Sequence, residues 1–110
     1  MKRQDISVAK AKKAISDYKK AIGHPKGVAE LSLFYCEEAV GLLSWCGMDD
    51  ESYYAALARM FDQALTAICG LPEAERASLL ERLDHLRLKS GQFGCGLKDA
   101  FDESWFCVVE

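Results

Sequence analysis

Glycine and proline divide this chain into segments that each carry the apolar spacing of an α-helix. The 110 residues contain only two prolines and eight glycines, and most of them stand between segments whose apolar side chains recur every three or four positions. Because proline cannot continue a helix and glycine weakens one, these residues indicate helix boundaries. The pattern predicts helices over residues 5–22, 25–46, 50–69 and 72–90, and a shorter one from 97 to about 105.

The expected fold is all-α: a compact bundle of four main antiparallel helices plus a short C-terminal helix. Each connection between the predicted helices is short, which favours antiparallel neighbours. The length and a hydrophobic content of 50% suit a single helical domain over residues 1–110. Residues 106–109 have no helical cap and are expected to be extended.

The second predicted helix, 25–46, is expected to lie at the centre of the bundle, because apolar side chains cover most of its circumference. Three core residues on facing helices should be nearly fully buried: Leu42, Phe61 and Leu83. Four glycines should end the first four helices: Gly23, Gly47, Gly70 and Gly91. Gly47 and Gly70 should act as C-terminal caps, and Asp49 should cap the third helix.

Charge is divided between a basic N-terminal helix and an acidic body. Residues 1–26 carry eight basic and two acidic side chains, a net charge of +6, and residues 27–110 carry six and fifteen, a net charge of −9. The chain therefore reads as a basic amphipathic helix, 1–22, joined to an acidic helical body, 25–110. The candidate basic face consists of Lys12, Lys13, Lys19 and Lys20. The helix should dock on the body through an apolar stripe of Val8, Ile15, Tyr18 and Ile22.

Cysteine usage and the lack of targeting signals indicate a cytosolic protein. The five cysteines are odd in number and form no C-x-x-C pair, so we expect free thiols, with Cys95 and Cys107 the more exposed. No apolar stretch follows the charged N-terminus, as a secretory signal would require. No segment is apolar enough to span a membrane, so we expect no membrane partner.

No catalytic site, metal site or cofactor is expected. The glycines at 91, 94 and 96 follow a helix and reverse the order of the dinucleotide fingerprint. His85 lies four residues after Glu81, but no further metal ligand is placed beside them. Glu38 borders the apolar side of its helix, where a salt bridge to a neighbouring helix is the better explanation. With two histidines and no clear polar pocket, the chain does not read as an enzyme.

The sequence favours a small cytosolic protein–protein interaction module without catalytic activity, which binds an unidentified protein or a second copy of itself. The candidate interaction surface consists of Tyr53, Tyr54, Phe93, Trp105 and Phe106. Tyrosine and tryptophan are frequent anchors of such surfaces. The alternative is that these rings simply pack in the core.

Two other functions remain open. A nucleic-acid-binding protein would use the basic first helix, but the chain as a whole is acidic, with a pI of about 5.4, and the helix carries one arginine. Nucleic acid is therefore the less favoured partner. An acidic inhibitor of the antitoxin or immunity type would mask the basic active site of another protein. Small size and acidity are the features that suggest it.

Overall fold

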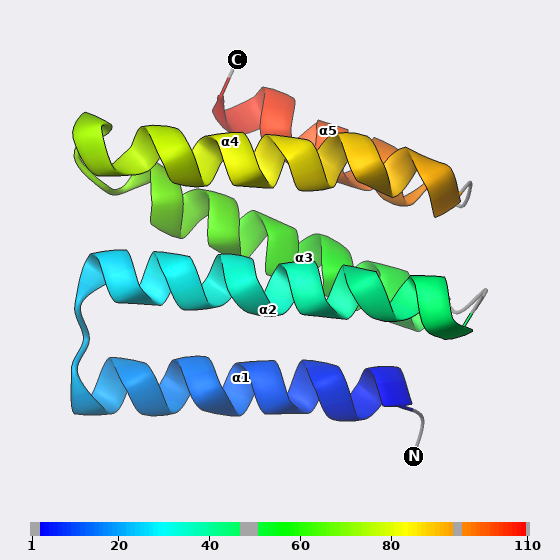
Figure 1. Ribbon diagram of the computed structural model, residues 1–110, viewed down its shortest axis with the longest axis horizontal. Coiled ribbons are helices and arrows are strands. Elements are labelled where there is room, and N and C mark those ends of the chain that lie inside the picture. The colour runs from blue at the N-terminus through cyan, green and yellow to red at the C-terminus, as the bar shows by residue number, and fades with distance from the viewer. Residues whose placement is uncertain (1–2, 47–50, 94–95, 110) are drawn as a thin grey trace.

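The computed structural model describes residues 3–46, 51–93 and 96–109, which form helices joined by short turns. The elements are α1 (Arg3–Ala21), α2 (Pro25–Cys46), α3 (Glu51–Cys69), α4 (Glu73–Lys89), the 3-10 helix η1 (Ser90–Phe93) and α5 (Leu97–Val108). Consecutive α-helices run antiparallel (Figure 1). The all-α bundle expected from the sequence is therefore confirmed.

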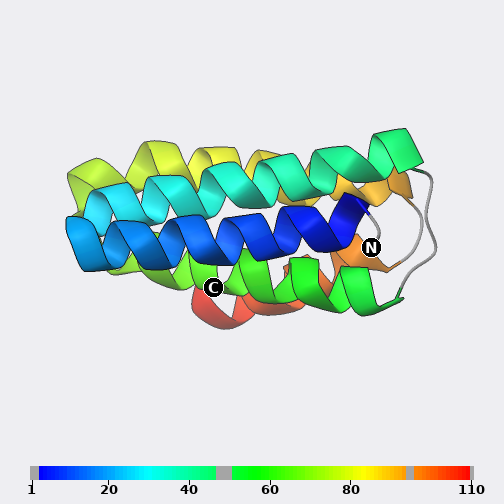
Figure 2. The ribbon, with the colours of Figure 1, turned by 90° about the horizontal axis from the view of Figure 1, so that it is seen from below.

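The helices stack in two layers. α2 and α4 form one layer and α3 and α5 the other, with α1 packed on the outer side of α2 (Figures 1 and 2). α1 and α5 therefore lie at opposite ends of the stack. No described helix combines the length and the apolar character that a bilayer crossing requires.

α3, rather than α2, is the central helix. It contacts each of the other four α-helices, and its buried face is formed by Tyr53, Leu57, Met60, Phe61, Ala64, Leu65 and Ile68. α2 leaves Glu30, Phe34 and Glu38 exposed. The prediction that residues 25–46 form the central helix is therefore wrong. Apolar side chains surround α2, but neighbouring helices cover only part of its circumference.

The core predictions hold for two of the three residues. Phe61 and Leu83 are completely buried, whereas Leu42 is only half-buried. The buried apolar side chains of α2 are Ala29, Leu33, Cys36, Ala39 and Val40. Leu42 follows Val40 by two positions, which turns its side chain by about 200° around the helix. Leu42 therefore lies at the margin of the buried face of α2.

α1 docks on α2 through a close contact between Tyr18 and Gly27. A side chain at position 27 would overlap with the Tyr18 ring, so the glycine makes room for it. Val8 packs against the buried core, and Ile15 is half-buried. The expected docking of α1 by its apolar stripe is therefore confirmed for these residues.

The end of α1 is formed by Gly23. This residue has a φ of 68°, and its N–H and that of Ile22 both donate to the Tyr18 carbonyl. Ile22 lies beyond the helix and is 68% exposed, so it does not dock as expected. The cap predicted at Gly70 is also wrong: Gly70 has no positive φ, and the chain turns with the Leu71 N–H donating to the Ile68 carbonyl.

α5 is longer than expected. Residues 106–108 are helical rather than extended, and the Val109 N–H still donates to the Trp105 carbonyl. The helical hydrogen-bond ladder therefore continues to the last described turn without a capping side chain. Four residues about which predictions were made lie outside the described part of the chain: Gly47, Asp49, Gly94 and Cys95.

Arg87 of α4 holds α5 against the body. Its Nη1 donates to Asp102 of α5 at 2.6 Å, and its Nη2 and Nε donate to Asp84 at 2.6 and 3.1 Å. The guanidinium also lies 5.2 Å from the centroid of the Trp105 ring and 5.4 Å from that of Phe106. The Arg87 side chain is only 11% exposed. These contacts join α4 to α5, which belong to different layers of the bundle.

Candidate functional site

The five aromatic residues of the candidate interaction surface do not form an exposed patch. Tyr53 is 2% exposed and its hydroxyl donates to the Ala39 carbonyl at 2.6 Å. Trp105 is 8% exposed, because the core and Arg87 cover it. Tyr54 and Phe93 are half-buried against the core. Phe106 is the one member of the set that is exposed. Of the interaction surface predicted from the sequence, only this residue therefore remains.

The four lysines of the candidate basic face are all exposed, but they do not share one face. Lys12 and Lys19 line a groove between α1 and α3, whereas Lys13 and Lys20 do not. Lys12 and Lys19 are seven residues apart, which is about two helical turns and places them on the same side of α1. Part of the positive charge of α1 therefore lies beside this groove.

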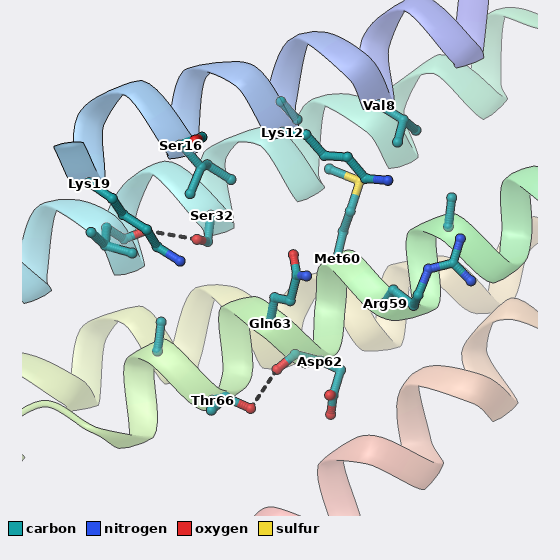
Figure 3. Close-up of a pocket in the computed structure, with 15 residues that line it drawn as sticks. Val8, Lys12, Ser16, Lys19, Ser32, Arg59, Met60, Asp62, Gln63 and Thr66 are labelled. Atoms are coloured by element: carbon teal, nitrogen blue, oxygen red, sulfur yellow. Dashed lines mark hydrogen bonds between the residues drawn. The ribbon is translucent and has the colours of Figure 1, made fainter. Parts of the chain in front are cut away.

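The groove runs between α1 and α3, with α2 as its floor (Figure 3). It has a volume of about 740 Å³, within the range of ligand-binding clefts. Its apolar side chains come from all three helices: Val8, Ala11, Ile15, Val28, Ala56, Met60 and Ala67. An adjoining cavity of about 420 Å³ shares Lys19 and Val28 and extends towards Gly23.

Two of the α3 residues that line the groove are alanines, Ala56 and Ala67. On its other side, α3 packs directly on α5, where the rings of Phe61 and Phe101 stack with centroids 4.3 Å apart. On the side of α1, Met60, Gln63 and Thr66 line the groove together with these two alanines. The short alanine side chains leave part of the space between the two helices open.

The rim of the groove is mainly cationic. Lys12 and Lys19 extend from α1 over the opening, and Arg59 lies on the α3 side (Figure 3). Asp62 also borders the groove, but its carboxylate points away from α1 (Figure 3). Three positive charges and one negative charge therefore surround an apolar floor, in a chain whose net charge is −3. Such a site attracts a ligand that is apolar on one side and acidic at its edges.

Two of the three residues with hydroxyl groups that line the groove, Ser32 and Thr66, donate hydrogen bonds within their own helices. The Ser32 hydroxyl donates to the Val28 carbonyl at 2.8 Å, and the Thr66 hydroxyl donates to the Asp62 carbonyl at 2.9 Å. Both bonds connect residues four positions apart, a common use of such side chains within helices.

The other polar residues selected from the sequence are dispersed. His85 and Glu81 are both exposed on α4, and Glu38 is exposed rather than near the core. The interhelical ion pair is made instead by Glu37, whose Oε1 accepts from Arg82 of α4 at 2.6 Å. Among the described residues, no three potential metal ligands lie together.

Cys36, Cys69 and Cys107 are free thiols that differ in burial. Cys36 is fully buried, and burial together with the neighbouring Glu37 carboxylate raises the pKa of its thiol to about 12. Cys69 is half-buried and Cys107 is exposed, as expected for the latter. Because the thiolate is the reactive form, Cys36 is a small apolar core residue rather than a nucleophile.

We expect iodoacetamide at about pH 8 to alkylate Cys107 in the folded protein and Cys36 only after denaturation. Peptide mass spectrometry after timed quenching would follow each thiol separately. Modification of Cys36 as fast as that of Cys107 in the folded protein would contradict the burial of Cys36.

Sequence reasoning did not select the α3 side of the groove, which includes Arg59, Met60 and Gln63. Arg59 and Gln63 are four residues apart beside the apolar face of α3, so their common side was visible in the helical spacing. Their position opposite Lys12 and Lys19 depends on how α1 and α3 both pack on α2.

Comparisons of the chain with protein-family models, with curated proteins and with solved structures give no match. We therefore infer function from the chemistry of the groove.

Proposed function

We propose that this protein is a non-catalytic, cytosolic interaction module that binds a helical segment of another protein in the groove between α1 and α3. The bound segment has an apolar face flanked by acidic side chains. The observation that carries this proposal is the apolar floor with Lys12, Lys19 and Arg59 at its edges. An amphipathic helix laid into an apolar groove is a recurring mode of recognition.

The dimensions of the groove suit a short helix. α1 lines it from Val8 to Lys19, a length of about 16 Å, which corresponds to about three helical turns. α1 and α3 run in the same direction (Figure 1), so a bound helix antiparallel to both has favourable dipole interactions. α2, on the floor, already has this orientation.

The cationic rim supports an acidic partner over a neutral one. Lys12 and Lys19 lie on one edge and Arg59 on the other, so carboxylates on both sides of the bound helix would meet positive charge. Exposed charges of this kind add modest affinity but determine which partner binds and how fast it associates. Binding should therefore weaken with added salt.

A matched pair of labelled peptides tests the proposal. Both are amphipathic helices of about 15 residues with the same leucine stripe, flanked by glutamates in one and by lysines in the other. In fluorescence anisotropy, we expect the glutamate peptide to bind at least about tenfold more tightly. Lys12→Glu with Lys19→Glu should abolish this preference, whereas Lys13→Glu with Lys20→Glu, the same charge change outside the groove, should preserve it.

Two results would contradict the proposal: failure of both peptides to bind, or equal loss of binding in the two double variants. The nucleic-acid alternative is tested in the same assay with labelled duplex DNA and RNA at about 0.15 M salt. If DNA or RNA binds tightly and salt weakens the binding, and if binding depends on Lys13 and Lys20 as much as on Lys12 and Lys19, the nucleic-acid alternative replaces the interaction-module proposal.

A further inference from the structure

The last turn of α5 exposes apolar side chains to an unusual extent. Phe106, Cys107, Val108 and Val109 are four consecutive exposed residues, and the three large ones are 48%, 46% and 40% exposed. On one side, the Phe106 ring lies beside Arg87 of α4. Contiguous exposed apolar residues of this kind typically mark an interaction surface.

The side of α5 that carries Phe106 also carries carboxylates. Asp99, Glu103 and Phe106 follow one another at spacings of four and three residues, which places them on one face of the helix. Asp99 and Glu103 are both exposed. The outer face of α5 is therefore acidic and ends in an apolar turn, the chemistry that suits the groove between α1 and α3.

The groove and the outer face of α5 cannot meet within one molecule. α1 and α5 lie at opposite ends of the stack (Figures 1 and 2). The stacked rings of Phe61 and Phe101 and the ion pair between Arg87 and Asp102 hold α5 in place. A contact between the two surfaces therefore requires two copies of the chain.

We propose that the groove between α1 and α3 receives the outer face of α5 from a second copy of this chain. Asp99 and Glu103 then lie near Lys12 and Lys19, and Phe106 and its neighbours reach the apolar floor. The inference rests on the groove being the binding site proposed above. Residues 99–109 span about 15 Å, close to the length of the groove.

The contact joins two different surfaces, so each molecule keeps one free groove and one free α5. Such head-to-tail contacts extend into chains unless the geometry closes them into a ring. The contact is limited to one groove and one helix of 12 residues, whereas stable complexes bury about 1,200–2,000 Å². Association is therefore weak, concentration-dependent and sensitive to salt.

Sedimentation equilibrium of the full chain, with a reducing agent to exclude disulfides through Cys107, tests this inference. From about 10 µM to about 1 mM, the average mass of the wild type should rise above 12.2 kDa, and about 0.5 M salt should reverse the rise. Lys12→Glu with Lys19→Glu should remain monomeric, as should Phe106→Ser with Val109→Ser. Lys13→Glu with Lys20→Glu should associate like the wild type.

Mixing the two defective variants gives the decisive result. The variant with Lys12→Glu and Lys19→Glu keeps a native α5, and the variant with Phe106→Ser and Val109→Ser keeps a native groove. Together they should form a 1:1 complex to which no further molecule adds. Wild-type protein that stays monomeric, unimpaired association of the Phe106→Ser and Val109→Ser variant, or no complex on mixing would each overturn the inference. If the wild type is monomeric but binds the glutamate peptide, the groove is the site of another protein and the proposed function stands.

Discussion

Replacing Phe61 by alanine should lower the free energy of unfolding by about 3–5 kcal/mol, the usual range for large aromatic side chains in a core. Phe61 is completely buried, and its ring stacks on that of Phe101. The substitution removes this stack and leaves a cavity where α3 meets α5. Since domains of this kind are stable by about 5–15 kcal/mol in total, a large part of the stability should be lost. Urea denaturation followed by circular dichroism measures the change.

Phe34→Ala is the matched control. Phe34 of α2 contacts Tyr35 edge to face but is 46% exposed. Its truncation should cost less than about 1 kcal/mol, because little area returns to water and little cavity forms. Equal losses in the two variants would contradict the placement of α3 at the centre of the bundle.

Helix boundaries were predictable because local residues determine them. Pro25 begins α2, Pro72 immediately precedes α4, and Gly23 ends α1 with a left-handed turn. The predicted ranges of the first four helices differ from the observed ones by only one or two residues. The end of α5 was missed because its hydrogen bonds to the preceding turn continue without any capping residue.

The positions of the aromatic side chains depend on contacts that no single helix contains. The Tyr53 hydroxyl reaches the Ala39 carbonyl on α2, and Arg87 of α4 covers Trp105. The four-residue spacing of Leu97, Phe101 and Trp105 places these three buried side chains on one face of α5. The error was to treat Trp105 as a surface anchor as well, although its helical position already placed it on that face.

The groove could not be predicted, because it depends on the rotation of one helix against another. Helical spacing places Lys12 and Lys19 on one face of α1 and Lys13 and Lys20 on another. Which pair faces α3 depends on the packing of α1 on α2, where Tyr18 contacts Gly27. That contact joins residues of two helices and leaves no signal in the apolar pattern of either one.

Replacing Arg87 by methionine should lower the free energy of unfolding by about 2–3 kcal/mol, because the variant leaves the partly buried Asp102 without one of its charged hydrogen-bond donors. Amide hydrogen exchange in α5 should also accelerate, since Arg87 joins this helix to α4. Arg82→Met is the control on the same helix. It removes an ion pair to Glu37 whose side chains are 47% and 33% exposed, so it should cost less than about 1 kcal/mol.

The pH dependence of the Arg87→Met effect tests its electrostatic origin. Burial alone would raise the pKa of the Asp102 carboxyl, but hydrogen bonds from Lys98 and Arg87 and their positive charges outweigh it and hold that pKa below its ordinary value. The carboxylate therefore stabilises the fold above about pH 4, and this contribution is lost as the pH falls through the lowered pKa. The stability difference between wild type and variant should shrink between neutral pH and about pH 2–3. If the difference stays constant, stacking of the guanidinium on Trp105 holds α5 instead, because arginine remains charged at both pH values.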